Sequence, residues 1–93
     1  MSVTVLLPGQ LRPLAAGRSS VILDGTTETV RQALTQLGSR LPAVHDRIFT
    51  EQGELRPHVN VFVGKTDIRW SGGLETPVNE GAELVILPSV SGG

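Results

Sequence analysis

The residues most suited to chemistry stand at the end of the sequence, which reads Val90-Ser91-Gly92-Gly93. Gly92 and Gly93 have no Cβ atom, so this segment can pass through a channel too narrow for other residues and deliver an α-carboxylate to a buried site. The last five residues, extended at about 3.3 Å each, reach roughly 16 Å from the domain. We expect Gly93 to be the reactive residue, and Val90, Ser91 and Gly92 to form the passage to it.

A terminal segment without any chemical role is the alternative, because loose ends of this kind are common. The same Ser-Gly-Gly triplet also occurs inside the chain, at Ser71–Gly73. There it lies between a predicted strand and Leu74, where glycine's tolerance of positive φ suits a turn. We interpret the internal triplet as a turn and only the terminal one as a candidate site.

Other residues of the sequence are weaker candidates for a catalytic or metal-binding role. The sequence has no cysteine, which excludes disulfides, thiolate metal sites and a nucleophilic thiol, and its two histidines, His45 and His58, have no ligand spacing. We therefore expect no metal, and place both histidines on the surface or in loops. No serine has a histidine and carboxylate partner in the pattern of a hydrolase, and no glycine-rich loop suits a bound nucleotide. Trp70 is expected to pack beside Ile68 rather than to stack on a ligand.

Composition limits the class of protein. The 93 residues are 39% hydrophobic, with no apolar run approaching the roughly 20 residues that a membrane helix needs. No export signal is recognisable, so we expect a single cytoplasmic domain. The formal net charge is -1, with charges of both signs interspersed, which argues against nucleic acid or an anionic membrane as the main partner.

Short alternating or β-branched runs bounded by Gly, Pro and Asp predict the strands. The predicted strands cover residues 3–7, 20–23, 59–63, 67–70 and 83–87. The first two form a hairpin with a long connection, and Gly64-Lys65-Thr66 turns the third strand into the fourth. Polar turns are expected at Gln52-Gly53-Glu54 and Asn79-Glu80-Gly81.

One helix follows the second strand. Val30, Ala33, Leu34 and Leu37 have the spacing of one buried face. We expect Thr26 or Thr27 to cap this helix, Glu28 to lie in its first turn and Gly38 to end it. A shorter helical segment begins at Leu41-Pro42, with Leu41, Val44 and Ile48 on one face.

The resulting order is strand, strand, helix, short helix and three strands. It predicts an α+β fold of the ubiquitin-like β-grasp type, in which a mixed sheet of four to five strands has one face covered by one main helix. The domain would span residues 1–88, and residues 89–93 would form a flexible tail. A ferredoxin-like sandwich is the alternative, but the second helix is too short for it.

Alternation along the strands also predicts a docking surface. Val59, Val61, Val63, Leu84 and Ile86 should face the helix, which leaves Phe62, Val85 and Leu87 on the opposite face. We expect these three to bind a partner near the tail. Arg69 could pair with an acidic rim of that partner, although a solvated strand charge is the alternative.

The last third of the sequence contains four notable stretches: Asp67-Ile68-Arg69, the run from Gly72 to Val78, the run from Glu80 to Pro88, and the final Val90-Ser91-Gly92-Gly93. In these stretches the sequence resembles the MoaD/ThiS family of ubiquitin-like sulfur carriers. The first loop, with Leu11-Arg12, Leu14-Ala15 and Gly17, is also similar, so the resemblance covers essentially the whole chain. Gly72-Gly73-Leu74 and Thr76-Pro77 most resemble the actinobacterial cysteine-pathway carriers. The small subunit of molybdopterin synthase usually has a more aromatic last strand and alanine where this sequence has Ser91.

The resemblance implies that a ubiquitin-activating-type enzyme uses ATP and Mg²⁺ to adenylate the Gly93 carboxylate, which a sulfur donor then converts to a thiocarboxylate. The chain would be a co-substrate rather than an enzyme and would bind no cofactor itself. In cysteine-pathway relatives, the resemblance implies a synthase with pyridoxal phosphate as sulfur acceptor and a zinc metalloprotease that releases the product. A molybdopterin synthase large subunit or a thiosugar synthase is an alternative acceptor.

Two other functions stay open. A protein modifier would transfer the activated Gly93 to lysine amines, whereas a non-covalent interaction module would bind partners through its sheet and would not need the tail. The residues leave undetermined the final acceptor, the identity of the activating enzyme and the oligomeric state.

Overall fold

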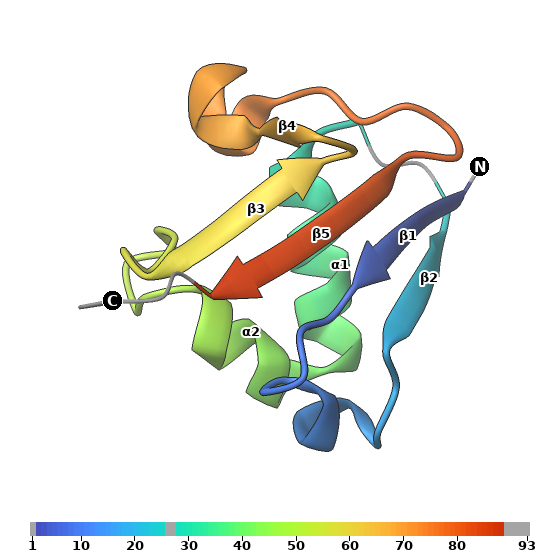
Figure 1. Ribbon diagram of the computed structural model, residues 1–93, viewed down its shortest axis with the longest axis vertical. Helices are drawn as coiled ribbons and strands as arrows, with labels where there is room; N and C mark the ends of the chain where they lie inside the picture. The colour runs from blue at the N-terminus through green and yellow to red at the C-terminus, as the bar shows by residue number, and fades with distance from the viewer. Residues whose placement is uncertain (1, 26–27, 89–93) are drawn as a thin grey trace.

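The computed structural model describes residues 2–25 and 28–88, which form one five-stranded sheet with two helices on one face (Figure 1). The strands are β1 (Ser2–Leu6), β2 (Ser20–Asp24), β3 (Val59–Val63), β4 (Thr66–Asp67) and β5 (Glu83–Pro88). The α-helices are α1 (Val30–Arg40) and α2 (Pro42–Ile48). Three short 3₁₀ helices complete the described elements: η1 (Arg12–Ala15), η2 (Ile68–Trp70) and η3 (Gly73–Glu75).

The strands lie in the order β2-β1-β5-β3-β4, so the last strand of the chain occupies the middle of the sheet. β1 pairs antiparallel with β2 and parallel with β5, and β3 pairs antiparallel with both β5 and β4. A β-hairpin, a covering helix and a central last strand parallel to the first define the ubiquitin-like β-grasp. The predicted fold is confirmed, and the ferredoxin-like alternative is wrong.

The core lies between the sheet and the helices. Alternate strand residues and one face of each helix fill it, and the largest fully buried side chains are Leu23, Leu34, Leu37, Ile48, Ile68, Leu84 and Ile86. The predicted helical face of Val30, Ala33, Leu34 and Leu37 is fully buried. Of the predicted inward set on the strands, Val61, Leu84 and Ile86 are buried, whereas Val59 and Val63 are only partly so.

The start of α1 differs from the prediction. Thr26 and Thr27 lie outside the described residues, and the N-cap is Thr29, whose Oγ1 accepts from the backbone N–H of Gln32 at 3.2 Å. Glu28 precedes the cap instead of occupying the first turn, and its N–H donates to Gln32 Oε1 at 2.7 Å. This reciprocal arrangement resembles a capping box, in which side chains satisfy the first free N–H groups of a helix. Backbone bonds to Thr76 and Val78 on both sides of Thr29 fix this entry to the helix.

Gly38 does not end α1, which continues to Arg40. A Cβ at position 38 would collide with the imidazole of His45 on α2. The glycine therefore permits the close approach of the two helices, which is a packing role and not the terminating role that its position suggested.

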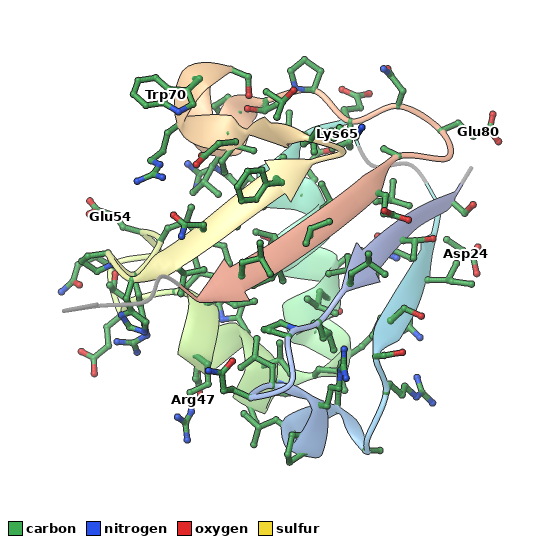
Figure 2. All side chains as sticks on the ribbon, in the orientation of Figure 1. Asp24, Arg47, Glu54, Lys65, Trp70 and Glu80 are labelled. Atoms are coloured by element: carbon green, nitrogen blue, oxygen red, sulfur yellow. The ribbon has the colours of Figure 1, made fainter. Side chains whose placement is uncertain are left out.

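The second half of the predicted hairpin is short. β4 has only two residues, after which the chain turns into η2, because the Asp67 carboxylate accepts from the backbone N–H of Arg69 and caps that turn. Ile68 then points into the core, whereas Trp70 is 83% exposed on the outside of η2 (Figure 2). The expectation that Trp70 packs beside Ile68 on a strand is wrong. Ser71 and Gly72 form a turn as predicted, and Gly73, which like Gly72 has a positive φ, is the first residue of η3.

Candidate functional site: the root of the C-terminal segment

The predicted reactive segment follows β5 in the chain. Pro88, the last described residue, pairs with Val59 of β3 and lies two residues beyond the buried Ile86. Val90, Ser91, Gly92 and Gly93, and the whole predicted tail of residues 89–93, lie outside the described residues. The structure therefore fixes the place from which the segment starts.

That starting point is firmly held. β5 is hydrogen-bonded to β1 on one side and to β3 on the other, and Leu84 and Ile86 are at most 2% exposed. The ladders satisfy backbone groups on both sides of the strand, and its inward side chains are in the core. An enzyme that holds the body of this domain thereby also positions the first residue of the segment.

The sheet face opposite the helices carries the predicted docking residues. Phe62 lies directly opposite Val85, which in turn lies beside Leu6 of β1, and Leu87 lies opposite Asn60. Leu87 is 43% exposed, and Phe62 and Val85 are partly exposed. We call Leu6, Ile22, Phe62, Val85 and Leu87 the free face. Its formation agrees with the predicted alternation, and its role in binding stays a prediction.

Leu6 and Ile22 were missed from this surface. Ile22 is 56% exposed on β2 and is the most exposed residue of the free face. The signal was present, since Val21 and Leu23 flank Ile22 and both are buried. Strict alternation should have placed Ile22 outward.

Arg69 is not a free strand charge. It lies on η2, and its guanidinium donates to the Asp67 carboxylate at 2.8 Å. The side-chain hydrogen bond from Arg69 is the main cause that lowers the pKa of Asp67, and the backbone N–H of Arg69 adds to it. The same ion pair raises the pKa of Arg69. A partner's carboxylate would have to compete with Asp67 for this side chain.

A cavity of about 210 Å³ lies at the root of the segment. It opens between the loop after β1, the last turn of α2 and the adjoining ends of β3 and β5, and we call it the root cavity. Its lining residues are Pro8, Gln10, Leu11, Arg47, His58, Val59 and Ile86. Sequence reasoning missed this feature, because the four segments that form it are far apart in the chain.

The two histidines have different environments. His45 is partly buried on α2, where its ring lies 4.7 Å from that of Phe49 and fills the space left by Gly38. It is a packing residue, so the prediction of a surface or loop position is wrong for His45. His58 is exposed, in a turn before β3, as expected. Within the described ranges, no group of His, Asp and Glu side chains is arranged to hold a metal ion. Nor does this part of the chain contain a helix long and apolar enough to cross a membrane.

Comparisons with known proteins identify the family of this chain. The sequence pattern of the ThiS family matches residues 5–93, which includes the terminal Gly92-Gly93. The chain belongs to the ThiS family. The resemblance read from the sequence motifs is thereby confirmed.

Relatives of this ThiS-family chain include the sulfur carrier protein CysO of Mycobacterium tuberculosis, which is 36% identical over 95 residues covering all of both chains. A crystal structure of an Amycolatopsis orientalis BexX/CysO complex contains a chain with a TM-score of 0.85 and 38% identity, over 98% of this chain and 99% of that one. The crystal structure of SAMP1 from Haloferax volcanii has a TM-score of 0.83 and 33% identity, over the whole of both chains.

Proposed function

We propose that this ThiS-family protein is a sulfur carrier of the CysO type, with the carboxylate of Gly93 as the site of sulfur loading. The observation that carries the proposal is the end-to-end similarity to CysO, at 36% identity over the full length of both chains. The family match spans residues 5–93, so the matched range includes the two terminal glycines on which the proposal relies.

The loading chemistry has two steps. A carboxylate oxygen of Gly93 attacks the α-phosphate of ATP on a ubiquitin-activating-type enzyme, forming an acyl-adenylate and releasing pyrophosphate. Hydrosulfide from a sulfur donor then attacks the acyl carbon, AMP leaves with the oxygen it shared, one proton is released, and Gly93 carries a thiocarboxylate. ATP and Mg²⁺ are bound by the activating enzyme, so the chain is a protein co-substrate and performs no turnover alone.

The fold is suited to the delivery of Gly93 into the active site of another protein. The central strand β5 ends at Pro88, five residues before Gly93, and an extended segment of that length reaches roughly 16 Å from the sheet. Gly92 and Gly93 would let the last part of the segment enter a narrow active site. Val90 and Ser91 would lie in the entrance of that active site.

For the acceptor we favour a synthase that makes cysteine, on the grounds of the similarity to CysO. Such a synthase would carry pyridoxal phosphate, and a zinc metalloprotease would release the product from the carrier. A thiosugar synthase or the large subunit of molybdopterin synthase would use the same thiocarboxylate. The sulfur chemistry at Gly93 is common to all three acceptors.

Intact-protein mass spectrometry tests the proposal directly. The chain is incubated with its host's activating enzyme, ATP and a sulfide source, and we expect a mass gain equal to the replacement of one oxygen by sulfur. Fragmentation should place the gain at Gly93. If no gain appears while the same enzyme loads a carrier known to be its substrate, the proposal is wrong.

Conjugation to other proteins is a second candidate, favoured by the similarity to SAMP1, whose name in full is small archaeal modifier protein 1. In this case a substrate lysine amine would attack the activated Gly93 and form an isopeptide bond. Tryptic digests of host proteins would then contain lysines that carry a C-terminal remnant of this chain. Their absence, in cells where the thiocarboxylate is detected, would leave sulfur transfer as the function.

A further inference from the structure

We propose that the root cavity is a docking site for the activating enzyme, which inserts one apolar side chain and places a carboxylate beside Arg47 and His58. This inference rests on the proposed function and identifies a second contact surface for the same partner. It adds to the free face, which lies on the other side of the sheet from the cavity's floor.

The cavity's size suits a side chain better than a small molecule. Pockets for drug-sized ligands usually have volumes of about 300–1,000 Å³. The root cavity has about 210 Å³, and its inner surface includes Ile86, Val59 and Leu11. Ile86 is 2% exposed, and the other two are partly buried against the core. A single aliphatic or aromatic anchor would cover this apolar floor.

The charges at the cavity favour a partner that carries an acidic residue close to that apolar side chain. Arg47 and His58 are the two basic residues of the lining, which contains no Asp or Glu. Both are exposed, and Figure 2 shows the Arg47 guanidinium extended away from α2. Within the described ranges neither forms an ion pair, whereas Arg31 and Arg69 are paired with Glu75 and Asp67. An unpaired guanidinium beside an apolar pocket is suited to a carboxylate of a partner.

The position of the cavity connects it to the chemistry at Gly93. Ile86 and Val59 belong to the end of the sheet where β5 stops, and Val59 pairs with Pro88 itself. An activating enzyme must hold the body of the domain while it draws the last residues toward ATP. A contact at the root fixes the origin of the segment and so restricts where Gly93 can go.

Charge reversal tests the proposal. Arg47→Glu and His58→Glu, alone and together, are compared with Arg18→Glu, which makes the same charge change at an exposed arginine outside the cavity. A third variant, Gln10→Trp, fills the opening of the cavity without changing its charge. The dissociation constant for the host's activating enzyme is measured for each, and thermal melting followed by circular dichroism verifies the fold.

We expect the double variant and Gln10→Trp each to weaken binding at least about tenfold, and Arg18→Glu to change it less than about twofold. Reversal at Arg47 should also lower the association rate at low salt, because rim charges act largely on association. The mass gain at Gly93 is measured in parallel, at enzyme concentrations above every dissociation constant.

Three results would overturn the inference. Unchanged affinity of the cavity variants, with normal sulfur loading of the wild-type chain, would reject the cavity and retain the proposed function. Unchanged affinity with slower loading would mean that the cavity acts on the chain's own last residues instead of on the enzyme. If the wild-type chain neither binds the enzyme nor becomes loaded with sulfur, the proposed function is rejected, and this inference is rejected with it.

Discussion

At the residue scale, the free face has consequences for binding, and the Asp67–Arg69 ion pair has consequences for the pH dependence of stability. Leu87 lies on the central strand one residue before Pro88, and nearly half of its surface is in solvent. Side chains of this kind contribute to binding mainly when a partner buries them completely. The position of Leu87 beside the root of the segment makes it the free-face residue nearest to the proposed chemistry.

We predict that Leu87→Ala weakens binding to the activating enzyme by about tenfold, because the minority of interface residues that carry most of the binding energy cost more than about 1 kcal/mol when truncated, and about 1.4 kcal/mol is tenfold in affinity. Ile22→Ala is the control, since Ile22 is an aliphatic residue of the same face that is more exposed than Leu87 but lies on the edge strand β2. Isothermal titration calorimetry measures both. Equal affinities for wild type and Leu87→Ala, with the fold intact, would exclude Leu87 from the interface.

The ion pair predicts a pH dependence. A carboxyl whose pKa is lowered on folding adds stability that is present above its unfolded pKa of about 3.9 and is lost as the pH falls through the folded value. We expect Arg69→Gln to raise the pKa of Asp67, as measured by NMR titration of its carboxyl carbon. The variant should be less stable than wild type near neutral pH, and the difference should disappear in acid. An unchanged pKa would show that the pair does not persist in solution.

At the element scale, the contact between α1 and α2 depends on Gly38. In an ordinary helix interior, Gly→Ala adds up to about 1 kcal/mol of stability. Here the added Cβ would meet the His45 ring, which is itself held against Phe49. The steric contact with His45 therefore predicts that Gly38→Ala lowers the stability of the protein, whereas intrinsic helix propensity predicts that it raises it.

We predict that Gly38→Ala lowers the free energy of unfolding by about 1–3 kcal/mol, the range expected for overpacking. In a His45→Ala background the obstacle is gone, and Gly38→Ala should then be neutral or stabilising. Urea denaturation of the four proteins of this cycle provides the measurement. Stabilisation by Gly38→Ala in the wild-type background would show that the helices can separate at little cost.

Elements with a regular period could be predicted from the sequence, and those that depend on single contacts could not. The alternation of Val59–Val63 and the buried stripe of α1 follow from spacing alone, so the strands, the main helix and the two sheet faces were found. Thr29 was missed as the cap because Thr26 and Thr27 are equally good caps by residue type. Gly38 was misread because its partner, His45, lies on the next helix.

The candidate site shows the same division. Gly93 was inferred from a terminal motif, which is a local signal, and its role stays a prediction because it lies outside the described residues. The free face near β5 was accessible to sequence reasoning, because a strand period is also a local signal. The root cavity was not, since it requires knowing that β5 lies between β1 and β3. Trp70 was misplaced because the capping contact from Asp67 ends β4 after two residues.

At the scale of the whole molecule, stability and the proposed chemistry are separable. Among the residues that the structure describes, the core cluster extends from Val3 to Ile86, and the proposed reactive group comes later in the chain. We predict that deletion of Gly92 and Gly93 leaves the melting temperature unchanged within about 1 °C and abolishes the mass gain at the C-terminus, since surface changes away from the core usually cost less than about 0.5 kcal/mol. Differential scanning calorimetry and mass spectrometry test the two parts. A large loss of stability would mean that the last residues belong to the fold.

The central place of β5 also has a consequence for biosynthesis. Ribosomes make β1, β2 and β3 first, and until residues 83–88 appear, the edges of β1 and β3 that will face β5 have no partner. Unpaired strand edges of this kind promote aggregation. A nascent chain that stops before β5 cannot close its sheet and should be open to chaperones and proteases, because closure requires residues 83–88, which are among the last to be made. Chains that complete the fold are thus, almost without exception, chains that also carry the group on which the proposed chemistry depends.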